Sequence, residues 1–142
     1  MFEFLDEMIK YCEIVIFTAA TKEYADFILD SIEVNNHYFD YRLYRQHTSF
    51  HGIYLVKDLS WLGRDLRKVI IVDNIAENFK LQNQNGLNIK TWTGEVNDKE
   101  LLYLKEILSN IFKNKSENIL PFIKTVKEHF VKNSNSYCNY ST

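Results

Sequence analysis

The chain has 142 residues, 46% of them hydrophobic, so it can bury one core but is too short for two ordinary domains. Its 17 basic and 19 acidic side chains give a formal charge of -2, which argues against nucleic acid as a partner. No apolar run approaches the roughly 18 residues needed to cross a bilayer, and the first residues do not resemble a signal peptide. Cys12 and Cys138 offer neither a disulfide framework nor metal-ligand spacing. We therefore expect an intracellular protein, and a monomer.

Hydrophobic spacing in the first quarter of the chain predicts helix, strand and helix in turn. Residues 2–10 have helical spacing, and the short, strongly apolar segment from Glu13 to Phe17 predicts a buried strand that ends at Thr18. A second helix is expected from Thr21, as its N-cap, to Val34. Its buried side should contain Tyr24, Ala25, Ile28, Leu29 and Ile32.

The middle of the chain predicts an arm and two further strands. Residues 41–47 alternate loosely and are followed by Gly52 and the apolar run 53–56, which indicates a hairpin-like arm rather than another crossover unit. Residues 69–72 form a second continuous apolar strand that stops at Asp73, and residues 87–92 predict a weaker third.

The last third of the chain predicts two helices and a tail. An amphipathic stretch from about 98 to 112 should close the domain, and residues 116–132 could form another helix. The polar segment 133–142 is expected to be disordered.

Chemically useful side chains follow the apolar strands. In a parallel sheet ligands bind outside the carboxyl ends of the strands, where Thr18 and the pair Asp73-Asn74 are expected. A hydroxyl suits phosphate, carboxylate and amide oxygens suit Mg²⁺, and Lys57 could neutralise phosphate charge. Taken singly, each feature is more often structural: a helix cap, a turn or a solvated charge. Their joint occurrence at the strand ends of one sheet favours a site.

Several longer strings resemble one family. They are YCEIVIFTAATKEYAD, RLYRQH, LVKDLSWLGRDL, VIIVDN and NQNGLNI, the last followed by a Trp. Over about residues 2–112 the chain resembles the small CTD-phosphatase family. This group includes Dullard-like and NLI-interacting-factor-like protein phosphatases of the haloacid dehalogenase (HAD) superfamily. The resemblance implies an α/β fold: a HAD-like, three-layer parallel sheet with helices on both faces and a small β-hairpin insert.

The resemblance also implies roles for individual residues. Thr18 would hydrogen-bond the transferring phosphoryl group, Lys57 would stabilise it, and Arg45 would help to bind the phosphate. Asn74 would be a Mg²⁺ ligand, with Asp73 either a direct ligand or a group that holds the metal's waters. The implied substrate is a phosphoprotein or phosphopeptide. For Arg45 the alternative is an ordinary exposed strand arginine.

One part of the family pattern does not occur in the sequence. Family members begin with a strand ending in Asp-x-Asp, whose first Asp attacks phosphorus and whose second acts as general acid. These 142 residues contain no such motif, and Asp6 cannot replace it because no Asp follows two residues later. We therefore expect no activity from this chain as it stands. We also expect a sheet without its first central strand, so that residues 14–17 and 69–72 either pair directly or leave a gap.

The absent motif leaves two explanations open, a start upstream of Met1 or a non-catalytic paralogue. The retention of Thr18, Lys57 and Asp73-Asn74 favours the first. A competing interpretation is a binding or scaffold subunit resembling the phosphatase-like component of the mitochondrial presequence translocase. We expect an incomplete domain over 1–112, a helical extension over 113–132 and a tail over 133–142. The expected compartment is nuclear or cytoplasmic, or the nuclear envelope or mitochondrial inner membrane if an upstream anchor exists.

Overall fold

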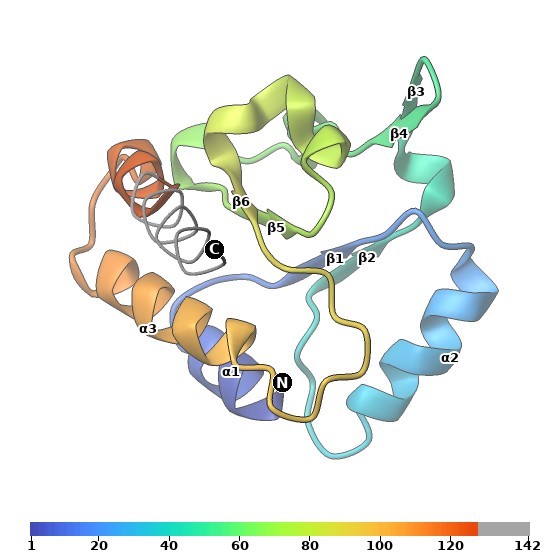
Figure 1. Ribbon diagram of the computed structural model, residues 1–142, viewed down its shortest axis with the longest axis horizontal. Coiled ribbons are helices and arrows are strands. Elements are labelled where there is room, and N and C mark those ends of the chain that lie inside the picture. The colour runs from blue at the N-terminus through green and yellow to red at the C-terminus, as the bar shows by residue number, and fades with distance from the viewer. Residues whose placement is uncertain (128–142) are drawn as a thin grey trace, which may run out of the picture.

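The computed structural model describes residues 1–127 as a mixed α/β domain with three short strand pairs (Figure 1). The α-helices are α1 (Phe2–Met8), α2 (Lys22–Ile32) and α3 (Glu100–Lys113). The strands are β1 (Val15–Phe17), β2 (Tyr41–Leu43), β3 (Ser49–His51), β4 (Tyr54–Val56), β5 (Ile71–Asp73) and β6 (Gly86–Asn88). A run of 3₁₀ turns, η4 (Ala76–Asn85), links β5 to β6. The predicted helix over 116–132 is helical from 120 to 127, and its remainder lies outside the described residues, as does the predicted tail.

The first strand pair is parallel and corrects one expectation. Val15 lies opposite Tyr41 and Phe17 opposite Leu43, so β1, α2 and β2 form a crossover unit. The prediction that residues 41–47 belong to a hairpin arm was therefore wrong for β2. Three residues are too few to show a strand period, and the neighbouring glycine and apolar run made the whole region resemble a hairpin.

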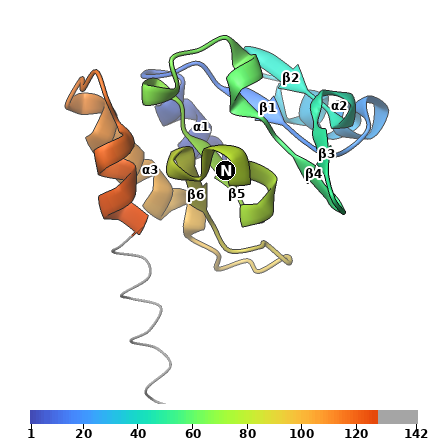
Figure 2. The same ribbon diagram turned by 90° about the horizontal axis from the view of Figure 1, so that it is seen from above.

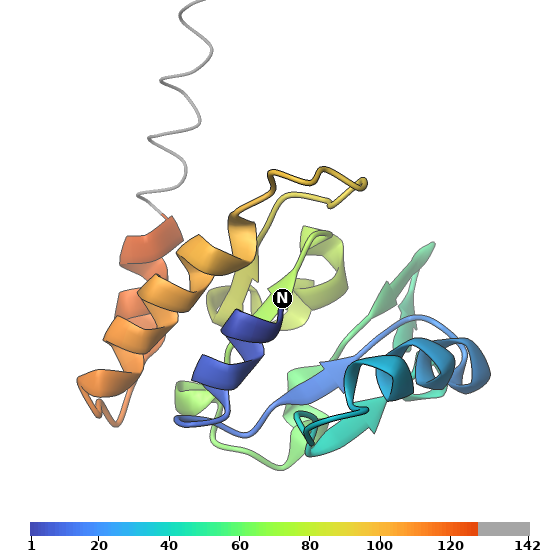
Figure 3. The same cartoon turned by 90° about the horizontal axis from the view of Figure 1, so that it is seen from below.

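The hairpin itself is confirmed further along the chain. β3 and β4 pair antiparallel around a turn in which Gly52 has a φ of +68°, a conformation that side chains with a Cβ disfavour. Figures 1 and 3 show this hairpin at the edge of the molecule, away from α1 and α3. Lys57 follows β4 directly, so the hairpin carries the candidate lysine back toward the centre of the domain.

The third pair places the predicted acidic residue at a strand end. β5 and β6 are parallel, with Asp73 as the last residue of β5 opposite Asn88. A Cβ on Gly86 would lie only 2.0 Å from the ring of Phe79, which is fully buried. Close packing of η4 against β6 therefore requires glycine at the start of β6.

A gap separates the β1–β2 pair from the β5–β6 pair. Among the described residues β1 is hydrogen-bonded only to β2, and β5 only to β6. Figure 2 shows β1, β2 and α2 on one side and β5 and β6 on the other. A cavity of about 920 Å³ lies between them, lined by residues 13–17 and 69–72 together with side chains of α1 and α3. Of the two arrangements expected from sequence, the structure has the gap.

Two apolar clusters hold the helices in place. One joins Met8 of α1 to Leu104 and Leu108 of α3, and also includes Ile119 and Ile123 from the predicted extension. The second packs Ala25 and Leu29 of α2 against the loop that follows it. Figure 3 shows α1 beside α3. The segment after α3 is thus part of the main core.

The buried side of α2 is narrower than predicted. Ala25 and Leu29 are buried, but Tyr24 is 65% exposed and Ile28 41% exposed. Tyr24 and Ile28 each precede a buried residue in the sequence and lie about 100° around the helix from it. They therefore fall outside the apolar stripe of α2 that faces the strands. Thr21 does occupy the N-cap position, but its side chain makes no capping hydrogen bond.

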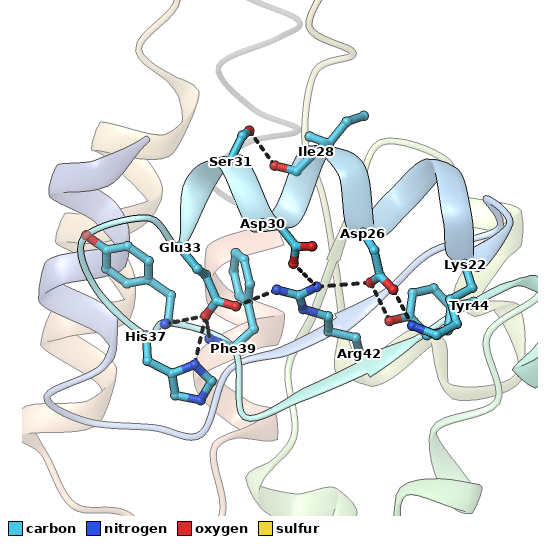
Figure 4. Close-up of polar contacts among 11 residues, drawn as sticks. Lys22, Asp26, Ile28, Asp30, Ser31, Glu33, His37, Phe39, Arg42 and Tyr44 are labelled. Atoms are coloured by element: carbon cyan, nitrogen blue, oxygen red, sulfur yellow. Dashed lines mark hydrogen bonds and ion pairs between the residues drawn. The ribbon is translucent and has the colours of Figure 1, made fainter.

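Charged groups connect α2 to β2 (Figure 4). Arg42 of β2 donates to Asp26 at 3.0 Å, Asp30 at 2.7 Å and Glu33 at 2.6 Å, all on or just after α2. Hydrogen bonds to Asp26 from Lys22, from Tyr44 and from Arg42 lower the pKa of that carboxyl to about 2. The network fixes the register of the crossover unit that presents Thr18.

No helix in the described part of the chain is long and apolar enough to cross a bilayer.

Candidate functional site

A second cavity, of about 350 Å³, lies where β1 and β5 end. It is lined by Thr18, Ala19, Ala20, Lys57, Val72, Asp73, Asn74, Asn78 and Ile89. Four of the five side chains singled out from sequence therefore line one small cavity, although they come from three separate segments of the chain. This is the position that a parallel arrangement of strands assigns to ligands.

Lys57 and Asp73 form a buried ion pair at the base of this cavity. The Lys57 ammonium contacts Asp73 Oδ2, and the two side chains are 11% and 3% exposed. The backbone N–H of Lys57 donates to the carbonyl of Asn78 at 2.6 Å. A charge buried to this degree is tolerated only when it is paired and hydrogen-bonded, so each residue holds the other in place.

The Asp73 carboxylate has its acceptor positions occupied. Oδ1 accepts from the Ile75 N–H at 2.9 Å and from Asn78 Nδ2 at 3.1 Å, and Asn78 Nδ2 also lies 3.2 Å from Oδ2, the oxygen that faces Lys57. A carboxylate offers about four lone-pair positions. In this arrangement its direct role is to hold Lys57 and the turn after β5.

Thr18 presents a hydroxyl proton to the cavity. Its Oγ1 accepts a hydrogen bond from the Ala20 N–H at 3.0 Å, and its own N–H donates to the Leu43 carbonyl at 2.8 Å. Because one lone pair of the hydroxyl is used by Ala20, its proton remains available for an acceptor such as a phosphate oxygen. The pairing of β1 with β2 is thus what aims Thr18.

Asn74 is oriented by a residue from the segment after β6. Its Nδ2 donates one hydrogen to Thr91 Oγ1 at 3.0 Å, which orients the amide group, and its oxygen accepts no hydrogen bond from the described residues. An amide oxygen is a hard ligand of the kind that Mg²⁺ takes. Among residues 1–127 no group of three or more His, Cys, Asp or Glu side chains could hold a metal. A cation here would rely on Asn74, on water and on an added ligand.

Arg45 lies beside the cavity but is not part of its lining. Its side chain is exposed, and the guanidinium Nε donates to the Ala19 carbonyl at 2.7 Å. The backbone N–H of Arg45 donates to the Ala20 carbonyl at 2.9 Å. Both alanines line the cavity, so these hydrogen bonds place the guanidinium at the rim of the cavity. The two terminal nitrogens of the guanidinium do not take part in the bond to Ala19. Its phosphate-binding role stays a prediction.

Asn78 is the contributor that sequence reasoning missed. Its side chain contacts both oxygens of Asp73, and its carbonyl accepts from Lys57. It lies within η4, five residues after Asp73, where the chain shows no clear helical or strand period. Only the rule that a buried carboxylate needs several donors could have prompted a search for it nearby in sequence.

The cavity can neutralise and orient a phosphoryl group but contains no unoccupied carboxylate to attack one. Lys57 supplies positive charge, Thr18 a hydroxyl donor and Asn74 an oxygen ligand. Among the described residues that line it, the one carboxylate, Asp73, is held by hydrogen bonds and by the lysine. The described residues of this cavity thus offer groups that could stabilise negative charge, while their one carboxylate is already hydrogen-bonded.

Comparison with known proteins agrees with this geometry. The family model described as NLI interacting factor-like phosphatase matches residues 1–119. The chain belongs to this family. The family implies a HAD-like fold, in agreement with the mixed α/β structure and its parallel strand pairs. The resemblance noted from the sequence is therefore confirmed.

The relatives of this phosphatase-family chain include proteins named as small phosphatase-like proteins and one named as a translocase subunit. It is 40% identical over 122 residues to CTD small phosphatase-like protein 2 of Dictyostelium discoideum, covering 86% of the chain and 21% of that protein. It is 42% identical over 109 residues to CTD small phosphatase-like protein 3 of Caenorhabditis elegans, covering 76% and 38%. It is also 38% identical over 118 residues to mitochondrial import inner membrane translocase subunit TIM50 of Homo sapiens, covering 83% and 32%. The chain thus spans less than two fifths of the length of these three relatives.

Proposed function

We propose that this chain provides the phosphate-binding and cation-binding half of a Mg²⁺-dependent phosphoprotein phosphatase site, and that its 142 residues alone do not hydrolyse phosphate monoesters. The observation that carries the proposal is that Thr18, Lys57, Asp73 and Asn74 line one cavity at the ends of β1 and β5. The family match supports the chemistry, and the absence of an Asp-x-Asp pair from the sequence supports the lack of turnover.

Each side chain has a separate task in this proposal. Lys57 balances the charge of the phosphoryl oxygens, and its position is fixed by Asp73, which is itself held by hydrogen bonds from Ile75 and Asn78. The Thr18 hydroxyl donates to one phosphoryl oxygen, and Arg45 adds donors at the rim. Reaction through an aspartyl phosphate would require a carboxylate that these residues do not contain.

The residues present fit Mg²⁺ in the way that phosphoryl-transfer sites commonly hold it. Mg²⁺ keeps several waters and takes one or two protein oxygens. Asn74 Oδ1 is the direct ligand that the structure offers, and the hydrogen-bonded Asp73 carboxylate is better placed to order the metal's waters than to bind it. The bound cation would supply further neutralisation of phosphate charge.

The test is phosphatase turnover with an aryl phosphate and Mg²⁺. We expect no turnover above the buffer rate for the 142-residue chain. For a longer polypeptide that also supplies the Asp-x-Asp strand, we expect turnover that is abolished by replacing the first Asp and greatly weakened by Lys57→Ala. Lys80→Ala is the matched control, because Lys80 is exposed and does not line the cavity. Metal-dependent turnover by the 142-residue chain, or equal losses for the two lysine variants, would overturn the proposal.

A second candidate is a non-catalytic, peptide-binding scaffold subunit. It is favoured by the 38% identity to a translocase subunit. A scaffold should bind an unphosphorylated peptide as tightly as its phosphorylated form, without any effect of Mg²⁺, whereas a phosphatase half-site should prefer the phosphorylated form. The cellular compartment also stays a prediction.

A further inference from the structure

The segment that follows β6 forms a turn beside the candidate phosphate cavity, and Figure 1 shows it in yellow between β6 and α3. Ile89 lines this cavity, and its N–H donates to the Asp73 carbonyl at 3.1 Å. Thr91 Oγ1 accepts a hydrogen bond from Asn74 Nδ2 at 3.0 Å. Trp92 is the next residue, so its backbone is anchored directly beside the cavity.

Glu95 holds this turn in one shape. Its carboxylate accepts from Lys90 Nζ at 3.0 Å and from the Thr93 N–H at 3.1 Å, and these bonds lower the pKa of the carboxyl to about 2. Gly94, between them, has a φ of +97°, a conformation that residues with a Cβ disfavour. Surface loops are usually mobile. A turn fixed by these contacts instead presents its side chains in defined positions.

Two apolar side chains of the turn face solvent. Trp92 is 69% exposed and Val96 is 98% exposed, and in the described part of the chain neither belongs to an apolar cluster. The indole N–H of Trp92 donates to the Glu95 carbonyl at 3.3 Å. The polar atom of the indole is therefore satisfied inside the turn, which leaves the apolar faces of the ring for a partner.

A peptide bound through its phosphate could span the step from the cavity to this patch. Thr91 lies one hydrogen bond from Asn74, and the Cα atoms of Thr91 and Trp92 are about 3.8 Å apart, as in any trans peptide. An extended peptide advances about 3.3 Å per residue. Two or three peptide residues thus cover the step from the phosphate to the indole.

The chemistry of the patch favours an uncharged aromatic side chain. Lys90 pairs with Glu95, so the charges of the turn balance each other and select neither a cation nor an anion. An aromatic ring can stack on the exposed indole, and such pairs contribute more to binding than their buried area alone. A single exposed Trp is common on protein surfaces. A Trp fixed beside a ligand cavity is a candidate contact for the ligand.

We propose that Trp92 and Val96 form an apolar subsite that binds an aromatic side chain two or three residues away from the phosphorylated residue of a peptide. This inference rests on the proposed function, because the phosphate cavity must hold the phosphate while the subsite holds the neighbouring ring. It adds a preference for peptide sequence to a site that would otherwise recognise only the phosphate.

The experiment measures the binding of phosphoserine peptides to the 142-residue chain by calorimetry in the presence of Mg²⁺. The host peptide contains only glycine and alanine around the phosphoserine. Four further peptides each carry one phenylalanine, placed two or three positions before or after the phosphoserine. We expect at least one of the four to bind about fivefold more tightly than the host peptide.

Variants of the chain assign this gain to the subsite. Trp92→Ala should remove it and leave the binding of phenyl phosphate unchanged, whereas Trp92→Phe should keep most of it. Trp61→Ala is the matched control, because Trp61 is 77% exposed and lines the larger cavity instead. In a Trp61→Phe background Trp92 is the one tryptophan left. Its fluorescence should then shift to shorter wavelength with the phenylalanine peptide and not with the host peptide.

The outcomes separate this inference from the proposed function. A gain that persists in Trp92→Ala, or no gain at any of the four positions, overturns the inference and leaves the phosphate site standing. An equal loss of phenyl phosphate and peptide binding in Trp92→Ala also overturns it, because Trp92 would then only hold the turn. So does a phenylalanine peptide that binds equally well without its phosphate. If neither phenyl phosphate nor the host peptide binds the unaltered chain, the proposed function fails and the inference fails with it.

Discussion

Replacing Lys57 by Met should destabilise the domain far more than a surface lysine replacement, because it leaves the Asp73 carboxylate buried without its cation. Removing one partner of a buried ion pair costs about 3 to 5 kcal/mol. Asp73 keeps its hydrogen bonds from Ile75 and Asn78, so we expect the lower end, about 3 kcal/mol, or roughly 10 °C in melting temperature. Urea unfolding at neutral pH, followed by circular dichroism, measures the change.

A double-mutant cycle identifies the cause of that loss. Asp73→Asn alone should also be costly, because it strands the lysine, while the double variant should recover a coupling free energy of about 2 kcal/mol. Lys22→Met is the matched control: Lys22 pairs with Asp26 at the surface, and such pairs contribute little. Additive effects of Lys57→Met and Asp73→Asn would refute the reasoning, since they would show that the two charges are not coupled.

Three further predictions concern acid stability, packing and thiol reactivity. Hydrogen bonds hold the pKa of Asp26 at about 2, so its stabilising effect should be complete above about pH 4 and lost as the pH falls toward 2. Asp26→Asn should therefore make the free energy of unfolding fall less steeply over this pH range, which pH-dependent unfolding measures. Gly86→Ala should lower the free energy of unfolding by about 2 kcal/mol or more through its clash with Phe79, and adding Phe79→Leu should restore part of the loss. Burial raises the pKa of Cys12 to about 11, so in a Cys138→Ser background its reaction rate with a thiol reagent should rise about tenfold per pH unit from about pH 7 to 10; a plateau near pH 9 would contradict this.

The parts of the fold that sequence predicted are those with strong local periodicity. α1, β1, β5 and α3 combine apolar runs or stripes with clear ends, and each lies within a few residues of its predicted place. β2 was not recognised because three residues carry no period, and its partner was decided by the crossover through α2. Long-range pairing of short strands depends on what the rest of the chain covers, which local pattern does not contain.

The candidate site shows the same division. Residues at strand ends could be found, because parallel strands bring their carboxyl ends to one edge, and Thr18 and Asp73 do line the same cavity. The residues that hold these side chains in place could not be found in this way. Asn78 and Thr91 contribute through tertiary contacts of an irregular turn and a loop, and Arg42 is meaningful only once α2 lies over β2. These contacts depend on the packed structure, not on the residue pattern.

The most direct test of the central claim is an amide NMR titration of the 142-residue chain with phenyl phosphate and Mg²⁺. The account predicts chemical-shift changes centred on residues 18–20, 57 and 73–78. These should weaken in Thr18→Val, which loses the hydroxyl donor, and persist in Lys80→Met, which lies outside the cavity. Changes that are scattered over the surface, or that are the same in both variants, would contradict the account.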